Sequence, residues 1–497
     1  MRLNPLLVVL IAAMAWSISF ANGDDRPNIL LIVSEDNGPE IGCYGDPSAR
    51  TPHLDRLASE GILFKNAYVP QAGCSQSRAS FLTGRYPHQH GQIGLATWGF
   101  QLYREDAPNL VRQLKSVGYR TGLIGKLHIN PASAFPFDMH EITSANFSRK
   151  QMQRYREVAQ AFMLENDEPF FLSVNYPDAH DPWIRQIEGL PKEPQTIEDV
   201  KIMPYMGVKS PELQNMVADY YNCISRLDSL IGDLLQTLER VGKAENTIVV
   251  YIGDHGADML RGKRTCYEGG LRIPMLIRWP GQIQPQVRDE LVSTLDLTPT
   301  FLEAASAPPI ADLPGAKLQA LFQPGDAPWR VKLFAEYHTH AAAPNYFPQR
   351  SVRDRRYKLI ETLLPRTTHP DYQNTIDKLH GDFIKQKYPG ALDLHQVIES
   401  APPSVREAYA TMQAPPRYLL FDLQVDPYEF HNLADDPKHA QTLRQLVEAL
   451  RQWRVETDDP LLDATKLEKL TAEVQAMKNK TASKAHQWEY PTYLLEQ

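Results

Sequence analysis

The stretch Asn28-Ile-Leu-Leu-Ile-Val33 decides the fold, because it is an unbroken apolar run of strand length. Pro27 precedes it, and the polar turn Ser34-Glu-Asp-Asn-Gly38 follows it. Apolar runs without alternation predict strands that are buried on both faces, and such strands are typical of parallel sheets covered by helices. We therefore expect residues 28–33 to form a central strand of an α/β domain.

The same pattern occurs three more times, each time with ionisable residues just after the apolar run. These runs and their endings are 121–125 with Lys126 and His128, 170–174 with Asp178 and His180, and 247–252 with Asp254 and His255. Amphipathic helical patterns alternate with them, as in residues 216–238. Ligands of open α/β sheets bind outside the carboxyl ends of the strands. We therefore expect four distant segments to meet in one cleft.

The chain is expected to contain two domains. Residues 350–360 and 417–422 have the composition of strands that belong to a separate sheet. We predict a domain of residues 24–345, with a large doubly wound mixed sheet flanked by helices. A smaller α+β domain with an antiparallel sheet is predicted for residues 346–497.

The first residues have the pattern of a signal peptide, predicted for residues 1–23. Arg2 precedes a mostly apolar run, residues 6–20, which is too short to span a bilayer, and the small residues Ala21-Asn22-Gly23 follow it. A membrane anchor is the alternative, and the mainly acidic Asp24-Asp25-Arg26 disfavours it. We expect an exported protein, periplasmic or secreted, or lysosomal in a eukaryote, with no stable membrane insertion after leader removal.

The charge and the cysteines exclude two classes of protein. Lys and Arg number 52 against 60 Asp and Glu, and a net charge of −8 argues against a nucleic-acid-binding protein. The four cysteines are few for an exported chain of 497 residues, so no disulfide framework is predicted.

The stretch Cys74-Ser-Gln-Ser-Arg-Ala-Ser-Phe-Leu-Thr-Gly-Arg85 has the features of a catalytic site. Cys74 follows the loop Pro70-Gln-Ala-Gly73 and does not lie in a periodic apolar run, and Arg78 comes four residues later. A helix that begins near Ser75 would direct free N–H groups and its positive dipole end toward an anion at Cys74. The pattern predicts a nucleophile beside a fixed cation.

A divalent metal ion is predicted among acids that follow two of the strands. Glu35 and Asp36 are adjacent after the first strand, and Asp254 follows the last of the four. Like charges in a half-buried turn repel each other unless a cation neutralises them. Carboxylate oxygens suit Ca²⁺, with Mg²⁺ or Mn²⁺ as alternatives. For Glu35 alone, the alternative is a solvated acid in a turn.

Residues 74–85 closely resemble the signature of type I sulfatases, C-x-P-S-R-x-x-x-L-T-G-R, with Gln76 where the pattern usually has Pro or Ala. The resemblance implies an alkaline-phosphatase-like fold and a maturase that oxidises Cys74 to formylglycine. One hydroxyl group of the formylglycine hydrate would attack sulfur, and the other would re-form the aldehyde and expel sulfate. Arg78 would hold the sulfate. The implied metal ligands are Glu35, Asp36, Cys74, Asp254 and His255.

Two further motifs imply roles in proton transfer and sulfate binding. Gly125-Lys-Leu-His128 is similar to the G-K-x-H motif of the family, in which Lys126 and His128 would contact formylglycine and sulfate, with His128 as the base. Asp178-Ala-His-Asp-Pro182 resembles the segment whose histidine, here His180, protonates the leaving group. For a single histidine the alternative is an ordinary core or surface residue.

Lys263 is implied to bring a further positive charge to the sulfate. It lies four residues before Tyr267-Glu-Gly-Gly270, which resembles the K-x-x-x-Y-E-G-G element of the family. Without that motif, a solvated lysine beside Arg261 and Arg264 would be the expected interpretation.

The resemblance covers nearly the whole mature chain and is closest to the heparan N-sulfatase (N-sulfoglucosamine sulfohydrolase) branch. Residues 88–95 and 426–433 carry it beyond the catalytic motifs, whereas Ala96-Thr97 stands where the animal N-sulfatases have His-Gln. The implied substrate is the N-sulfate of glucosamine at a non-reducing end of a sulfated saccharide. An exo O-sulfatase is the alternative enzyme, and a formylglycine-free pseudoenzyme that binds sulfated sugar is the alternative of another class. A phosphate or phosphonate ester hydrolase is a third. The oligomeric state stays open, with a homodimer as one option.

Overall fold

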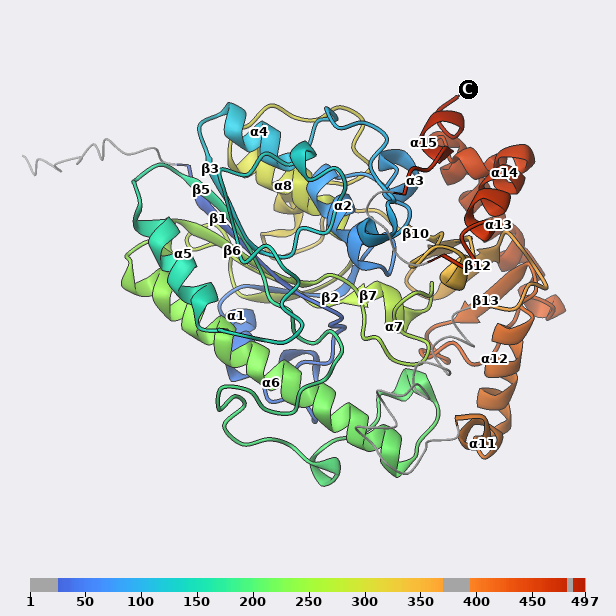
Figure 1. Cartoon of the computed structure of the whole chain (residues 1–497). Coiled ribbons are helices and arrows are strands. Elements are labelled where there is room, and N and C mark those ends of the chain that lie inside the picture. The colour runs from blue at the N-terminus through green and yellow to red at the C-terminus, as the bar shows by residue number, and fades with distance from the viewer. Residues whose placement is uncertain (1–25, 370–393, 481–485, 497) are drawn as a thin grey trace, which may run out of the picture.

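The computed structural model describes residues 26–369, 394–480 and 486–496. A large sheet lies between two layers of helices, and a smaller sheet with its own helices lies beside it toward the C-terminus (Figure 1). The predicted signal peptide, residues 1–23, falls outside the described residues. Among the described helices, none is long and apolar enough to cross a membrane.

The large sheet is mixed and has nine strands. Eight follow the order β4-β3-β5-β1-β6-β8-β2-β7, and β9 also pairs with β2. Their bounds are β1 Asn28–Ser34, β2 Ile62–Tyr68, β3 Arg120–Gly125, β4 Met139–Glu141, β5 Phe170–Asn175, β6 Thr247–Gly253, β7 Arg272–Ile273, β8 Met275–Arg278 and β9 Gln286–Ser293.

The centre of this sheet is parallel, as the apolar runs predict. β1 pairs in parallel with β5 on one side and with β6 on the other, and β3 pairs in parallel with β5. Every residue of these four strands is buried. Their carboxyl ends therefore meet at one edge of the sheet, and the prediction of a large doubly wound mixed sheet is confirmed.

Helices cover both faces of the large sheet (Figure 1). On one face α1 (Pro52–Ser59) and α5 (Arg154–Leu164) both pack against the long α6 (Pro211–Arg240). The other face carries α2 (Cys74–Thr83), α4 (Leu110–Ser116) and α8 (Leu297–Ala304). The short helices α3 (Pro87–His90) and α7 (Glu268–Leu271) lie in the connections.

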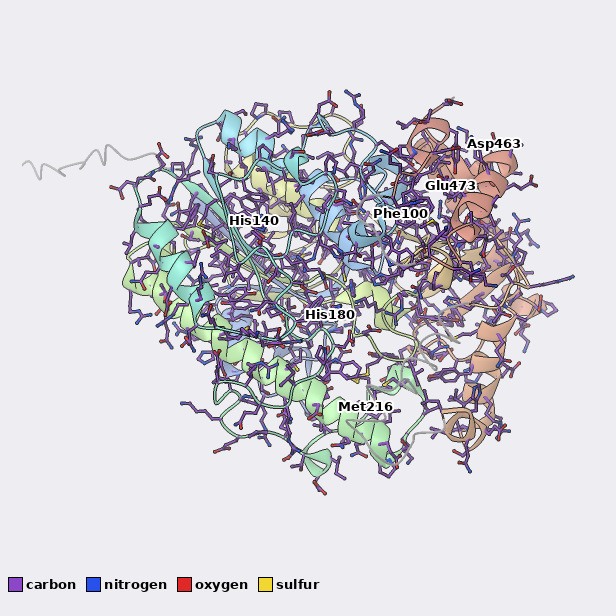
Figure 2. All side chains as sticks on the ribbon, viewed as in Figure 1. Phe100, His140, His180, Met216, Asp463 and Glu473 are labelled. Carbon is purple, nitrogen blue, oxygen red and sulfur yellow. The ribbon has the colours of Figure 1, made fainter. Side chains whose placement is uncertain are left out.

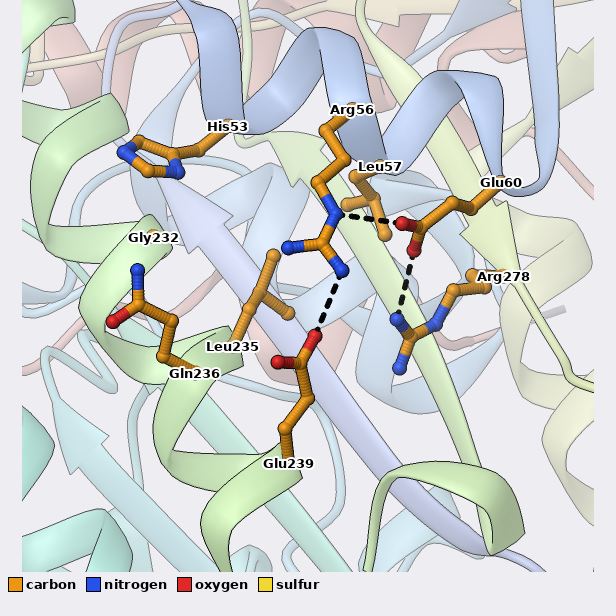
Figure 3. A pocket seen from close by; sticks show the side chains of 9 residues that line it. All are labelled: His53, Arg56, Leu57, Glu60, Gly232, Leu235, Gln236, Glu239 and Arg278. Atoms are coloured by element: carbon orange, nitrogen blue, oxygen red, sulfur yellow. Dashed lines mark hydrogen bonds and ion pairs between the residues drawn. The ribbon is translucent and has the colours of Figure 1, made fainter.

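Ion pairs line a shallow hollow between α1 and α6 (Figure 3). Arg56 contacts Glu60 at 2.7 Å and Glu239 at 3.0 Å, and Glu60 contacts Arg278 of β8 at 3.0 Å. The side chains of Arg56, Glu60 and Glu239 are partly or well exposed to solvent, whereas Arg278 is buried. Exposed pairs of this kind contribute only about 0–1 kcal/mol each, so the hollow is a feature of helix packing.

The smaller sheet is antiparallel, with the order β10-β11-β12-β13. Its strands are β10 Leu333–Tyr337, β11 Gln349–Arg353, β12 Tyr357–Thr362 and β13 Tyr418–Asp422. Leu446, Leu450 and Trp453 of α13 (Ala440–Glu456) pack against it. The remaining helices are α11 Leu394–Glu399, α12 Pro403–Gln413, α14 Ala464–Gln475 and α15 Tyr490–Tyr493.

Two details of this region differ from the expectation. Residues 350–360 belong to two strands, β11 and β12, because the polar residues 354–356 turn the chain back on itself. β10 joins the smaller sheet although it precedes residue 345. The predicted domain boundary near residue 345 remains a prediction.

Asp228 of α6 supports a prediction about pH and stability. Its buried carboxylate accepts hydrogen bonds from the backbone N–H groups of His53 and Leu54, at 3.2 and 2.8 Å, in the first turn of α1. Burial raises its pKa from 3.8 to about 7. At pH values between these two pKa values, Asp228 is ionised to a greater extent in the unfolded chain than in the folded one. The free energy of unfolding of the wild type therefore falls as the pH rises.

We expect Asp228→Asn not to lose stability in this way as the pH rises, because an amide does not ionise. The variant loses one acceptor for the α1 N–H groups and should be less stable than the wild type near pH 4. The difference in the free energy of unfolding between the two proteins should shift in favour of the variant as the pH rises to 8. Urea unfolding of both proteins at pH 4, 6 and 8 measures it, and a difference that does not change with pH would contradict the assignment.

Candidate active site

Cys74 is the first residue of α2 and is buried, with 1% of its surface exposed. The chain enters the helix through Gly73 in an extended conformation, and the backbone N–H of Ser77 donates to the carbonyl of Gly73 at 2.9 Å. The helix ends at Gly84, whose φ of 72° lies in the left-handed region that favours glycine. The thiol therefore lies at the positive end of a fully buried helix.

Arg78, one turn further along α2, connects three of the strand ends. Its guanidinium donates to the carbonyl of Lys126 at 3.0 Å, to Oδ1 of Asn175 at 2.7 Å and to Oδ2 of Asp254 at 3.0 Å. Oε1 of Glu35 lies 3.7 Å from it. The predicted cation is thus fixed in place beside Cys74.

The predicted acids and lysines form direct ion pairs. Nζ of Lys126 lies 2.6 Å from Oε2 of Glu35, and Nζ of Lys263 lies 2.9 and 3.0 Å from the two carboxylate oxygens of Asp36. The backbone N–H of Asp36 donates to Oδ1 of Asp254 at 2.9 Å. Four distant segments therefore meet at the carboxyl edge of the sheet.

A bend after β3 brings both Lys126 and His128 to the site. Alternation along a straight strand would place them on opposite faces. Gly125 has a φ of 92° and His128 a φ of 57°, so the strand does not continue through them. Both ring nitrogens of His128 are buried and have no hydrogen-bond partner among the described residues.

The two predicted proton-transfer histidines have pKa values shifted in opposite directions. Burial and the neighbouring Lys126 lower the pKa of His128 from 6.5 to about 4. Burial alone would lower the pKa of His180 as well, but the carboxylate of Asp36 raises it above the usual value. Such a separation suits a neutral base and a protonated acid in one site.

The thiol of Cys74 is held in a positive field. Burial alone would raise its pKa, but the ammonium groups of Lys126 and Lys263 lower the pKa well below its usual value. Preorganised positive charge of this kind also stabilises an oxyanion that develops on residue 74 or on a bound anion.

His180 follows β5 and lies near the centre of the molecule in Figure 2. Its Nδ1 donates to the carbonyl of Asp181 at 2.6 Å. Four side chains each place one possible metal-ligand atom within 4.8 Å of those of the others: His180, Glu35, Asp36 and Cys74. The structure thus brings the predicted general acid to the other predicted residues.

The predicted metal-binding residues also come together and fit a hard cation. Atoms of Cys74, Asp254 and His255 lie within 4.8 Å of one another, and Nε2 of His255 lies 3.4 Å from Sγ of Cys74. Oε1 of Glu35 is buried and lacks a hydrogen-bond partner in the described part of the chain. Sγ of Cys74 stands where an oxygen of formylglycine hydrate would lie. The donor set is therefore rich in oxygen, as Ca²⁺ or Mg²⁺ requires.

Two connections at the site have no signal in the sequence. Asn175, the last residue of β5, accepts a hydrogen bond from Arg78. Gln76, which departs from the sulfatase signature, donates from Nε2 to the carbonyl of Thr339 at 2.6 Å. The contact of Asn175 depends on the pairing of β5 with β1. The contact of Gln76 depends on the position of residue 339 after β10.

Comparison with known proteins gives the family. The pattern described as "Sulfatase" matches residues 27–307, and "N-sulphoglucosamine sulphohydrolase, C-terminal" matches residues 253–378. The chain belongs to the sulfatase family. It is therefore a hydrolase of sulfate esters or sulfamates, as the resemblance of residues 74–85 implied.

Relatives of this sulfatase align over most of its length. Human N-sulphoglucosamine sulphohydrolase is 32% identical, with 91% of this chain and 96% of the relative covered. The "Ulvan-active sulfatase" of Formosa agariphila is 28% identical, with 86% and 80% covered.

Solved structures share the fold of this sulfatase. One, in complex with its substrate D-glucosamine-2-N,6-O-disulfate, has a TM-score of 0.64 at 21% identity and covers 87% of this chain and 98% of its own. The phosphonate monoester hydrolase of Agrobacterium radiobacter has a TM-score of 0.65 at 18% identity, with 87% and 96% covered. The expectation of an alkaline-phosphatase-like fold with a smaller antiparallel domain is confirmed.

Proposed function

We propose that this sulfatase removes the N-sulfate from glucosamine at the non-reducing end of a sulfated saccharide, with formylglycine at residue 74 as the nucleophile. The observation that carries the proposal is the burial of Cys74 at the start of α2 among Arg78, Lys126 and Lys263. A cluster of positive charges around a buried side chain favours the binding of an anion there. Formylglycine would supply two geminal hydroxyl groups, one to attack sulfur and one to release sulfate as the aldehyde re-forms.

The cationic residues and the two histidines would then have different roles in the reaction. Arg78, Lys126 and Lys263 would hold the sulfate oxygens, where positive charge counters the charge that develops during transfer. His180, with its raised pKa, would protonate the departing nitrogen or oxygen. His128, neutral at physiological pH, would take the proton from the second hydroxyl group.

A divalent ion, Ca²⁺ in our proposal, would be held by Glu35, Asp36, Asp254, His255 and residue 74. When bound, it would supply positive charge that polarises the nucleophile and the sulfate. The three carboxylates already face the three cations Arg78, Lys126 and Lys263, so the ion would add net positive charge. That excess suits a site for anionic substrates.

The substrate is proposed from the relative with 32% identity, human N-sulphoglucosamine sulphohydrolase. One observation favours the exo O-sulfatase alternative. The backbone N–H of Ala96 donates to Oγ of Ser75 at 2.9 Å, so the segment Ala96-Thr97 lies against the residue that follows Cys74. This segment differs from the animal N-sulfatases, and the difference therefore lies at the site.

Two measurements test the proposal. The tryptic mass of the peptide that carries residue 74 should show formylglycine after co-expression with a maturase. The matured enzyme should release sulfate fastest from glucosamine N-sulfate when it is compared with the 6-O- and 3-O-sulfated isomers and with a sulfated galactose. Preference for an O-sulfated sugar would replace the N-sulfatase assignment. An unmodified thiol without any sulfate release would favour the pseudoenzyme. Export of the protein and formation of a homodimer remain predictions.

His180→Ala should separate substrates by their leaving group. We expect a loss of roughly 10² to 10⁴ in kcat on the best sulfated sugar, because its leaving group needs a proton. The loss on 4-nitrophenyl sulfate should be much smaller, since nitrophenolate departs without protonation. Steady-state kinetics on both substrates measure the two losses, and equal losses would assign His180 to binding.

A further inference from the structure

Phe147 lies flat on the imidazole of His180. Their ring centroids are 4.0 Å apart, and their planes are inclined by 18°. Nζ of Lys126 lies 5.2 Å from the centroid of the same phenyl ring. One aromatic side chain in the connection between β4 and α5 thus contacts both the proposed general acid and a proposed sulfate-binding lysine.

The guanidinium of Arg149 joins the backbones of Phe147 and His180. Nη1 donates to the carbonyl of Phe147, and Nη2 donates to the carbonyl of His180. Arg149 is fully buried. Because the donors of a planar guanidinium point in fixed directions, these bonds fix the two backbones relative to each other.

A second arginine fixes Arg149 in turn. Nε of Arg149 donates to Oδ1 of Asp178 at 3.0 Å. Arg226 of α6 donates to the two oxygens of the same carboxylate at 2.7 and 2.8 Å. Hydrogen bonds therefore connect the segment of Phe147, through Arg149 and Asp178, to the long helix α6.

The orientation of the His180 ring follows from these contacts. Nδ1 is engaged with the carbonyl of Asp181 at 2.6 Å, and one face of the ring is covered by Phe147. Nε2 is left as the nitrogen that can serve the reaction. Rotation about χ2 would break the Nδ1 hydrogen bond, and rotation about χ1 would separate the stacked rings.

We propose that Phe147, held by Arg149, is a positioning residue that orients His180 for proton transfer to the leaving group. The inference rests on the proposed role of His180 as the general acid. Phe147 does not itself exchange protons. Its contribution is to keep Nε2 at the distance and angle that proton transfer needs, and small misplacements of a catalytic group can cost up to about 10²-fold in rate.

The test compares Phe147→Leu, which removes the flat ring but keeps apolar bulk, with Phe147→Tyr, which keeps the ring. Phe147→Leu should lower kcat on the best sulfated sugar by roughly 10- to 100-fold. The loss on 4-nitrophenyl sulfate should stay under about twofold, and Phe147→Tyr should restore most of the activity on the sugar. Phe137→Leu is the matched control, because Phe137 is also half-buried and stacks on Phe171, away from the site.

A double-mutant cycle separates this inference from the proposed role of His180. In the His180→Ala background, Phe147→Leu should cause no further loss on the sugar, because no general acid is left to orient. Equal losses on both substrates, or a full further loss in the His180→Ala background, would overturn the positioning role. If His180→Ala alone shows no dependence on the leaving group, the proposed acid is wrong and the inference fails with it.

Discussion

Cys74→Ala is expected to abolish sulfate release from every substrate. The side chain lies at the start of α2 among the cations that would hold the sulfate, and residue 74 is the proposed nucleophile. Loss of a catalytic nucleophile costs on the order of 10⁶ in kcat. Steady-state rates on glucosamine N-sulfate and on 4-nitrophenyl sulfate measure the effect, and residual activity within tenfold of the wild type would contradict it.

The matched control for this change is Cys43→Ala. Cys43 is a free, half-buried cysteine outside the site, and burial raises its pKa to about 12. Its replacement should leave kcat within about twofold. Cys74→Ser adds a test of mechanism, because a serine has no second hydroxyl group with which to release sulfate. We expect this variant to accumulate one sulfate group on residue 74, seen as a mass increase of the peptide.

Asp254→Asn should lower turnover by about 10⁴-fold or more. The carboxylate accepts from Arg78 through Oδ2 and from the backbone N–H of Asp36 through Oδ1. An asparagine turned to keep the Asp36 bond would direct its NH₂ group at the guanidinium of Arg78. The site would lose one negative charge of its proposed metal ligands and the anchor of Arg78 together, and each of these contributes several kcal/mol to the transition state.

Metal content and turnover should fall together in this variant. Elemental analysis of the purified protein measures bound Ca²⁺, Mg²⁺ and Mn²⁺, and circular dichroism shows whether the fold survives. Asp228→Asn is the matched control, because it also replaces a buried carboxylate that accepts two hydrogen bonds, but in α6 at the start of α1. A chelated Asp254→Asn protein with wild-type turnover would remove the metal hypothesis.

The large sheet could be predicted from the sequence because its central strands are buried on both faces. Burial leaves no room for polar alternation, so β1, β3, β5 and β6 are visible as apolar runs with ionisable endings. Parallel pairing then places those endings at one edge. The predicted site residues were found together for this reason.

Other parts of the site were beyond sequence reasoning because they depend on backbone bends and on contacts between distant segments. The positive φ of His128 removes the conflict between Lys126 and His128, but bends of this kind are not encoded in apolar spacing. Phe147 lies in a connection without periodicity, and its contact with His180 forms only when the chain folds back. The membership of β10 in the smaller sheet depends likewise on partners that begin at Gln349.

The central place of β1 bears on when Cys74 could be modified during synthesis under the proposed mechanism. β1 is made early, but its two neighbours end at Asn175 and Gly253. Until both have left the ribosome, β1 lacks its partners and its edges remain unpaired. During that interval the chain around residue 74 is accessible to a modifying enzyme, whereas only 1% of Cys74 is exposed once the fold has closed. In the proposed mechanism, oxidation of Cys74 would therefore have to precede the pairing of β1 with β6.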